Sequence, residues 1–156
     1  MKQIKYIVAI AAITLGFSAC KKGFDAEAQF AADTTAIRAY VTANNIPAVK
    51  DDYGVFHHVI TPGSGSVKYT GSSLVTVDYY GKILSGSENF DSSNGSPREF
   101  TLGGLITGWQ IGIPYIQKGG KIRLFIPSKY GYGNDSQPGI PANSVLDFTI
   151  ALSDVK

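Results

Sequence analysis

The sequence predicts an α+β domain in which an antiparallel sheet has one face covered by a single short helix. Apolar and polar residues alternate through several short segments, which is the period of a strand with one buried face. Glycine is abundant, with 18 residues, and 9 tyrosines accompany it, a composition typical of strands and turns rather than of a helical bundle. The connections between the alternating segments are short, which favours antiparallel neighbours in the sheet.

Residues 1–19 have the pattern of a secretory signal peptide. A basic start, Met1 to Lys5, precedes an apolar run over 6–17, which is too short to cross a hydrocarbon layer of about 30 Å as a helix. Small residues then precede Cys20, and this junction resembles the lipobox at which bacteria cleave the leader and acylate the cysteine. We therefore expect lipidation of Cys20 and an exported, membrane-anchored chain, on the periplasmic side or at the outer membrane. The alternative is an ordinary signal peptide followed by an incidental cysteine.

Residues 20–50 are expected to form a lipid-anchored tether and a helix. Apolar residues recur there at roughly helical spacing, with alanines between them. Asp25 and Asp33 are the two candidate N-caps, and Asn44 with Pro47 should end the helix. We expect this helix to pack on the domain or to hold it away from the membrane, and its short stripe gives little support to dimerisation. The stripe comprises Phe30, Ile37, Tyr40, Val41 and Asn44.

Residues 51–156 are expected to form one domain of strands and turns. A short helix around 107–113 interrupts the strands, with Thr107 as its cap and Pro114 limiting its length. A long loop rich in glycine and proline follows over 131–143. The expected strands cover 55–60, 73–80, 98–102, 121–127 and 145–152.

Charge and residue counts exclude several classes of function. Loss of Lys2 and Lys5 with the leader leaves 12 basic and 12 acidic residues, and no stretch clusters lysine and arginine, so nucleic-acid binding has no electrostatic support. Cys20 is the only cysteine, which excludes an intramolecular disulfide and a cysteine-based metal cage. His57 and His58 are adjacent on an expected strand and point to opposite faces, so they cannot chelate one metal together. We expect no metal and no cofactor.

Six short segments between Val77 and Pro141 follow one another in a recognisable order. Together they resemble the FK506-binding (FKBP) type of peptidyl-prolyl cis/trans isomerase, and the resemblance extends from Tyr53 to Val155. It implies a half-wrapped antiparallel sheet around one short helix, preceded by an N-terminal helix as in exported bacterial members, with an apolar hollow between sheet and helix as the substrate site. The segments are Val77-Asp78-Tyr79-Tyr80-Gly81, Phe90-Asp91-Ser92-Ser93, Phe100-Thr101-Leu102-Gly103, Ile106-Thr107-Gly108-Trp109, Lys129-Tyr130-Gly131-Tyr132-Gly133 and Pro138-Gly139-Ile140-Pro141.

The resemblance also implies the residues of the site. Trp109 would form the floor of the hollow, and the Tyr132 hydroxyl would bind a substrate carbonyl. Asp91 would act electrostatically or as the hydrogen-bond acceptor of Tyr79, not in proton transfer. The residues implied as catalytic are Tyr79, Asp91, Trp109 and Tyr132, and those implied as substrate-binding are Phe90, Leu105, Ile106, Ile140 and Phe148.

The sequence departs from the family's pattern at two places on the rim of this hollow. Family members often carry an aromatic residue two positions before the phenylalanine equivalent to Phe100, where this chain has Arg98. The loop over 138–141 is shorter than in some members, which have an extra apolar residue before the last proline. Both departures bear on substrate preference and macrolide affinity more than on activity itself.

The reaction implied is the cis/trans isomerisation of X-Pro bonds in exported protein clients. Rotation about an X-Pro bond takes tens to hundreds of seconds, because it breaks the amide resonance at a barrier of about 18–20 kcal/mol. The carbonyl of a twisted amide is less polar than that of a planar one. An apolar pocket therefore stabilises the twisted transition state relative to the planar ground state.

The expected partners are proline-containing proteins that are unfolded or partly folded, an FK506-like macrolide ligand and the lipid anchor. A non-catalytic chaperone or peptide-binding module that uses the same hollow is the main alternative function. A structural lipoprotein that uses the fold as a spacer is a further alternative. It is disfavoured, because a spacer has no reason to keep an aromatic hollow.

Overall fold

The structure, a computed structural model, describes residues 23–156. The expected leader over 1–19 and the expected lipidation site, Cys20, lie outside the described residues. None of the helices within 23–156 combines the length and the apolar character needed to cross a bilayer.

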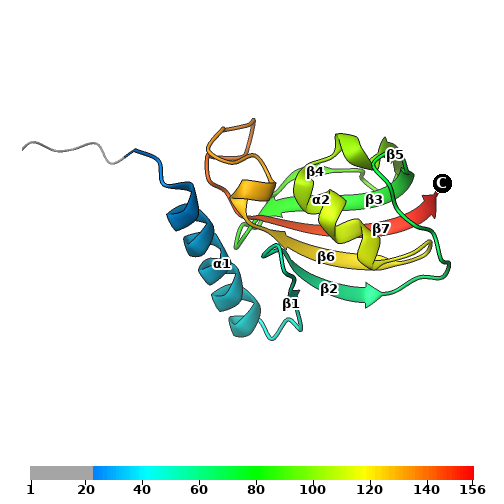
Figure 1. The fold of residues 1–156 in the computed structure, drawn as a ribbon, viewed down its shortest axis with the longest axis horizontal. Helices are drawn as coiled ribbons and strands as arrows, with labels where there is room; N and C mark the ends of the chain where they lie inside the picture. The colour runs from blue at the N-terminus through cyan, green and yellow to red at the C-terminus, as the bar shows by residue number, and fades with distance from the viewer. Residues whose placement is uncertain (1–22) are drawn as a thin grey trace, which may run out of the picture.

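A seven-stranded antiparallel sheet forms the centre of the domain (Figure 1). Its strands are β1 (Val49–Lys50), β2 (Phe56–Thr61), β3 (Leu74–Ile83), β4 (Asn89–Ser92), β5 (Arg98–Thr101), β6 (Lys121–Ile126) and β7 (Leu146–Val155). The order is β1-β2-β6-β7-β3-β4, and β5 also pairs with β3. The start of β3 pairs with β5 and its end pairs with β4, whereas its other edge pairs with β7. This sheet and its short helix confirm the expected α+β class.

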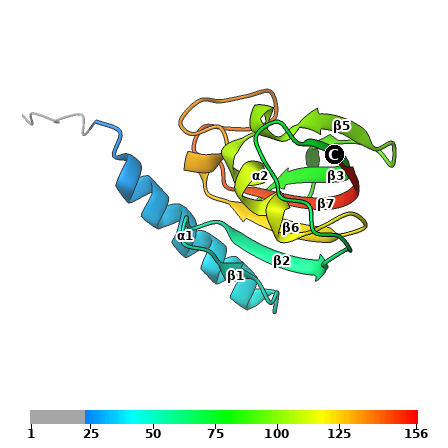
Figure 2. The same ribbon diagram turned by 45° about the vertical axis from the view of Figure 1, so that its right-hand side comes forward.

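One face of the sheet packs against α2 (Thr107–Gly112), which continues as the 3-10 turn η2 (Ile113–Tyr115) (Figure 2). The helix lies very close to β6 because two of its residues are glycines. A Cβ atom added at Gly108 would lie 2.4 Å from the Ile126 side chain, and one added at Gly112 would lie 2.5 Å from that of Leu124. The buried strand residues of this main core are Val75, Val77, Tyr79, Ile122, Leu124, Ile126, Leu146, Phe148, Ile150, Leu152 and Val155.

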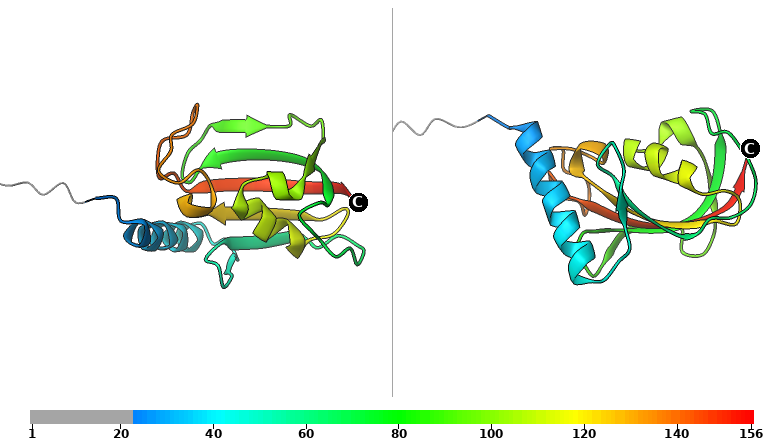
Figure 3. Two further views of the ribbon diagram at one scale, coloured as in Figure 1. Left: turned by 45° about the horizontal axis from the view of Figure 1, so that its top comes forward. Right: turned by 60° about the horizontal axis from the view of Figure 1, so that its bottom comes forward.

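The opposite face of the sheet is covered at one end by α1 (Ala26–Ala43), the expected N-terminal helix (Figure 3). Phe125 alternates with its neighbours in β6 and therefore points away from α2. It joins Phe56 in a second buried cluster with Ile37 and Val41 of the helix. Of the two arrangements expected for the N-terminal helix, the structure has the packed one.

The two candidate caps of α1 have different places in the structure. Asp25 is the N-cap, and its side chain accepts a hydrogen bond of 3.0 Å from the N–H of Ala28. Asp33 lies in the helix interior and is buried. The helix ends at Ala43 with Asn44 as its C-cap, as expected.

The expected cap of α2 was wrong. Ile106 occupies the N-cap position without a side-chain hydrogen bond, and Thr107 is the first helical residue. The carbonyl of Ile106 accepts from the N–H of Trp109 at 2.9 Å, and this backbone hydrogen bond closes the first turn of the helix. Strands β1 and β4 were also not expected. β1 has only two residues, and β4 has four residues of which one is apolar, so neither shows an alternating pattern.

Candidate functional site

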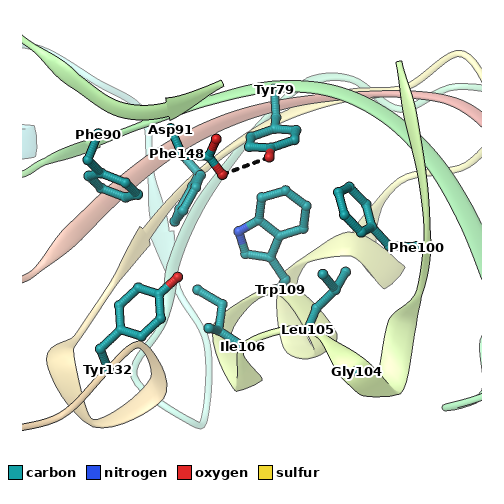
Figure 4. Close-up of a pocket in the computed structure, with 10 residues that line it drawn as sticks. All are labelled: Tyr79, Phe90, Asp91, Phe100, Gly104, Leu105, Ile106, Trp109, Tyr132 and Phe148. Carbon is teal, nitrogen blue, oxygen red and sulfur yellow. Dashed lines mark hydrogen bonds between the residues drawn. The ribbon is translucent and has the colours of Figure 1, made fainter. Parts of the chain in front are cut away.

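A cavity of about 300 Å³ opens between the sheet and α2 (Figure 4). Strands β3, β4, β5 and β7 supply one side, and α2 with the 3-10 turn η1 (Leu102–Gly104) and the segment after it supplies the other. The loop after β6 closes the remaining side. The residues that line the cavity are Tyr79, Phe90, Asp91, Phe100, Gly104, Leu105, Ile106, Trp109, Tyr132 and Phe148.

Trp109 forms the floor, and the rings of Tyr79, Phe100 and Phe148 pack directly against it. The Trp109 side chain is 4% exposed, and the rings of Tyr79 and Phe148 stand nearly perpendicular to it, each with its centroid 5.1 Å away. The ring of Phe90 packs edge-on against Phe148 at 5.5 Å. Perpendicular aromatic pairs at these distances are favourable. These rings therefore form an apolar cup of defined shape rather than a loose hydrophobic patch.

Tyr79 and Asp91 form a hydrogen-bonded pair at the rim. The Tyr79 hydroxyl donates to Oδ2 of Asp91 at 2.8 Å (Figure 4). Burial raises the pKa of Tyr79 to about 12, and the hydrogen bond and charge of Asp91 act in the same direction. The hydroxyl is therefore protonated at neutral pH and the carboxylate is its acceptor, the contact that the sequence led us to expect. The catalytic role of the pair stays a prediction.

A buried serine fixes the two strands that carry this pair. The Ser93 hydroxyl accepts from the backbone N–H of Tyr79 at 2.8 Å and donates to the Asp78 carboxylate. The N–H of Ser93 in turn donates to the carbonyl of Tyr79 at 3.0 Å. The sequence assigned Ser93 no role beyond its place in a recognised segment, so this function of Ser93 was missed.

Arg98 lies beside the pair, where the family pattern often has an aromatic residue. Its Nη1 donates to the Tyr79 hydroxyl at 3.4 Å and lies 4.0 Å from Oδ1 of Asp91. Its Nη2 donates to the carbonyl of Ser92 at 3.1 Å. The side chains of Arg98 and Asp91 are 49% and 52% exposed, so the ion pair is screened by solvent and contributes little to stability. Arg98 replaces an apolar surface with a positive charge at the rim.

The wall opposite the sheet consists of Leu105, Ile106 and Tyr132. The first two precede α2, and the Gln110 side chain donates to the carbonyl of Leu105 at 2.7 Å, which fixes that segment. Tyr132 comes from the loop after β6, and its hydroxyl points into the cavity (Figure 4). Burial, with a smaller effect of the Asp91 charge, raises the pKa of Tyr132. The hydroxyl is therefore protonated at neutral pH and can donate a hydrogen bond.

The structure brings together eight of the nine implied site residues and leaves out one. Ile140 is 5% exposed and belongs to the main core rather than to the lining of the cavity. Gln137 and Ile140 exchange both backbone hydrogen bonds in a tight turn, and the Ile140 side chain packs in the core. Phe100 and Gly104 line the cavity and were not foreseen. Phe100 lay within a recognised segment, which was the signal available in the sequence. In the structure it lies on β5 opposite Val75.

The site suits binding rather than bond-breaking chemistry. Its polar groups are two protonated tyrosine hydroxyls, a carboxylate and an arginine, arranged around an aromatic floor. Within residues 23–156, no group of three or more histidine, cysteine or acidic side chains is placed to hold a metal ion. The cup fits a small apolar ring, and the hydroxyls at its rim can orient a peptide carbonyl.

Comparison with known proteins agrees with this geometry. The family model described as FKBP-type peptidyl-prolyl cis-trans isomerase matches residues 65–153. The FKBP-type peptidyl-prolyl cis-trans isomerase FkpA of Escherichia coli (strain K12) is 44% identical over 105 residues, which are 66% of this chain and 38% of that protein. FK506-binding protein 1 of Saccharomyces cerevisiae is 43% identical over 101 residues, 62% of this chain and 88% of that protein.

Two solved structures resemble the chain. The crystal structure of FkpA from Escherichia coli superimposes with a TM-score of 0.70 at 33% identity, over 83% of this chain and 64% of that one. A peptidyl-prolyl cis-trans isomerase from Pseudomonas syringae superimposes with a TM-score of 0.71 at 29% identity, over 85% of this chain and 97% of that one. The matches to the FkpA relatives span 34% to 43% of their length.

Proposed function

Because the chain belongs to the FKBP-type peptidyl-prolyl cis-trans isomerases, we propose that it accelerates cis/trans isomerisation of X-Pro bonds in protein clients. The observation that carries this proposal is the aromatic cup over Trp109, with protonated hydroxyls at its rim. The reaction needs no nucleophile and no cofactor, and the site offers neither an activated nucleophile nor a general base in the cup.

Catalysis follows from what the cup does to an amide. A proline ring would pack on Trp109 between the rings of Tyr79, Phe90 and Phe148, which strips water from the adjoining imide bond. The planar imide carries a more polar carbonyl than the twisted one, so this loss of water raises the energy of the ground state more than that of the transition state. The Tyr132 hydroxyl is placed to hold a substrate carbonyl while the bond turns.

The free energy required is modest. A thousandfold acceleration needs a barrier lower by about 4 kcal/mol, since each factor of ten corresponds to about 1.4 kcal/mol. One or two hydrogen bonds that are stronger in the twisted state supply about 0.5–1.5 kcal/mol each. Removal of the imide from water supplies the remainder.

We further propose that the chain is exported and that its first mature residue is a lipidated Cys20. Support comes from the lipobox-like junction and from the position of α1, which begins at Ala26, only a few residues later. Each acyl methylene buried in a bilayer contributes about 0.8 kcal/mol to anchoring. Mass spectrometry of the mature N-terminus tests this, and an unmodified Cys20 or an intact leader would reject it. Partly folded exported proteins would then be the clients.

Peptide binding without turnover is the second candidate, and Arg98 favours it. The guanidinium lies within hydrogen-bond distance of the Tyr79 hydroxyl and makes the rim more polar than an aromatic residue would. Such a rim can hold a peptide without placing its imide bond in the dry part of the cup.

One experiment separates the two candidates. Isomerisation of a short prolyl peptide is followed by the chain without its leader, by Trp109→Leu and by Tyr53→Leu, an aromatic-to-leucine control at an exposed position. We expect acceleration by the wild type and the control, and loss in Trp109→Leu. A wild-type rate equal to the uncatalysed rate rejects the isomerase, and retained binding of an unfolded client in that case supports the second candidate.

A further inference from the structure

Asp33 has a buried carboxylate in the middle of α1, outside the lining of the cavity, and one of its partners, Ser128, lies 95 residues later in the sequence. The residue is 3% exposed. Its Oδ2 accepts from the backbone N–H of Ser128 at 2.8 Å and from the Ser128 hydroxyl at 2.6 Å. Its Oδ1 accepts from the Gln29 side chain at 2.7 Å. A buried carboxylate is costly unless its oxygens are bonded in this way, so these contacts hold α1 and Ser128 firmly together.

Ser128 in turn holds the backbone on both sides of Tyr132. Its carbonyl accepts from the N–H of Gly131 at 2.9 Å and from the N–H of Gly133 at 2.8 Å. Gly133 has a φ of +61°, in the left-handed region that glycine adopts without strain. Tyr132 is the residue between these two anchors.

The contact between α1 and the turn η3 (Ser128–Tyr130) extends beyond the buried hydrogen bonds (Figure 3). The ring of Phe30 packs edge-on against Tyr130 at 5.9 Å. Lys129 pairs with Glu27 at 3.3 Å, and its ammonium lies 5.1 Å from the centre of the Phe30 ring. Both charged groups are exposed, so this ion pair contributes little. The Asp33 carboxylate is therefore the dominant link between helix and turn.

We propose that Asp33 is a positioning residue for Tyr132, which makes α1 the outer support of one wall of the cavity; this rests on the proposed isomerase function. Tyr132 lies at the start of the glycine- and proline-rich loop over 131–143, where the backbone has little regular pairing of its own. A hydroxyl that must meet a substrate carbonyl loses much of its effect when displaced by about 1 Å. The helix lies outside the family-model match over 65–153, so this chain has an added part that acts on the shared site.

A double-mutant cycle between Asp33 and Tyr132 tests the proposal. We compare kcat/KM of the wild type, Asp33→Ala, Tyr132→Phe and the double variant, at a temperature where circular dichroism shows all four to be folded. We expect Asp33→Ala to lower kcat/KM about three- to tenfold, the range for one or two lost hydrogen bonds, and to cause no further loss once the Tyr132 hydroxyl is gone. Asp25→Ala weakens the same helix at its exposed cap and should leave kcat/KM unchanged.

The opposite results overturn the proposal. Equal losses from Asp33→Ala with and without the Tyr132 hydroxyl would mean that the two residues act independently. Unchanged activity in a folded Asp33→Ala protein would mean that the carboxylate only stabilises the fold. Should Asp33→Ala fail to fold, Asp33→Asn and Ser128→Ala, which each keep part of the contact, enter the same cycle and decide the question by the same criteria.

A second readout does not depend on activity. With ring-labelled tyrosine, the Tyr132 resonances should shift or broaden in Asp33→Asn, while those of Tyr115, which lies away from the loop, stay in place. Unmoved Tyr132 resonances reject the positioning role. If the Tyr132 resonances shift in Asp33→Asn but the wild type does not accelerate isomerisation, the proposed function is rejected and the structural link between Asp33 and Tyr132 stands.

Discussion

The two walls of the cavity are held in place in different ways. The wall of Tyr79 and Asp91 belongs to paired strands, and Ser93 locks it through residues 14 and 15 positions away in sequence. The wall of Tyr132 belongs to a loop, and its nearest strong anchor is Ser128, held by Asp33 from a helix 95 positions earlier. The first wall is a property of the sheet itself. The second depends on an element outside it, so the two walls should respond differently to substitutions.

Removing the floor that both walls share should have the largest effect. Trp109→Leu opens the cup and separates the rings of Tyr79 and Phe148. We expect kcat/KM to fall by about 100-fold, equivalent to about 2.7 kcal/mol, and the free energy of unfolding to fall by about 2–4 kcal/mol through the cavity left behind. Peptide isomerisation kinetics and urea unfolding measure the two effects. A loss below threefold in a folded variant would contradict the role of Trp109 as the floor.

Breaking the sheet wall alone should have the next largest effect. Asp91→Ala removes the acceptor of the Tyr79 hydroxyl, and we expect kcat/KM to fall about tenfold, or about 1.4 kcal/mol. The pKa of Tyr79 should fall from about 12 towards its ordinary value, yet stay above it, because burial is the largest cause of the shift. Ultraviolet titration of the tyrosines measures this pKa.

The Asp91 substitution also sharpens the comparison of the two walls. If the walls are supported independently, Asp91→Ala and Asp33→Ala should show additive losses. A strong departure from additivity would mean that the walls move together.

Arg98 should change preference more than rate. Its guanidinium places a positive charge beside Asp91 and the Tyr79 hydroxyl. Arg98→Leu should lower kcat/KM about two- to fourfold more for peptides with an acidic residue before proline than for those with leucine there, the range for an exposed charge pair. Arg38→Leu, at an exposed position on α1, is the control. An equal effect on both peptides would show that Arg98 does not contact that residue.

Acidification should lower the stability of the fold while having the smallest effect on the two walls. Burial lowers the pKa of His57 from its ordinary value of 6.5, and the nearby charge of Asp51 offsets this only in part. Below pH 6.5 the unfolded chain therefore binds more protons than the folded one, and stability falls as the pH falls. Urea unfolding at pH 8 and pH 5 should show this loss, and His57→Gln should reduce it.

The same acidification leaves the site almost untouched. His57 stacks on Tyr115 in η2 at 4.0 Å, outside the cavity, so the activity of the folded fraction should be similar at both pH values. A steep fall in that activity would point to a titrating group in the cup.

The parts of the fold that could be predicted are those whose signal lies within a few residues. Alternation predicted the buried face of β3 through Val75 and Val77, and the sequence offered two N-caps for α1, of which the structure has Asp25. Strand β4 could not be predicted from the sequence, because its four residues form a strand only by pairing with β3. Threonine is a common N-cap residue, which is why the sequence predicts Thr107. In the structure Ile106 holds the N-cap position, because its carbonyl accepts the hydrogen bond of the first turn from the N–H of Trp109.

The candidate site shows the same division. Of the eight expected residues that line the cavity, six lie in the recognised segments, and Leu105 and Phe148 lie outside them. Ile140 lies in a recognised segment but packs in the core, and residue identity does not report where a loop side chain points. Asp33 was considered only as a cap. Its true contact spans the chain and depends on how α1 docks on the sheet, which no local pattern in the sequence encodes.

The glycines of α2 have a further consequence for any ligand. Alanine at Gly108 or Gly112 would press on Ile126 or Leu124 and push the helix outward, and the indole of Trp109 would move with it. How deeply a five-membered ring can sink into the protein is thus set by two hydrogen atoms that stand where most residues carry a carbon.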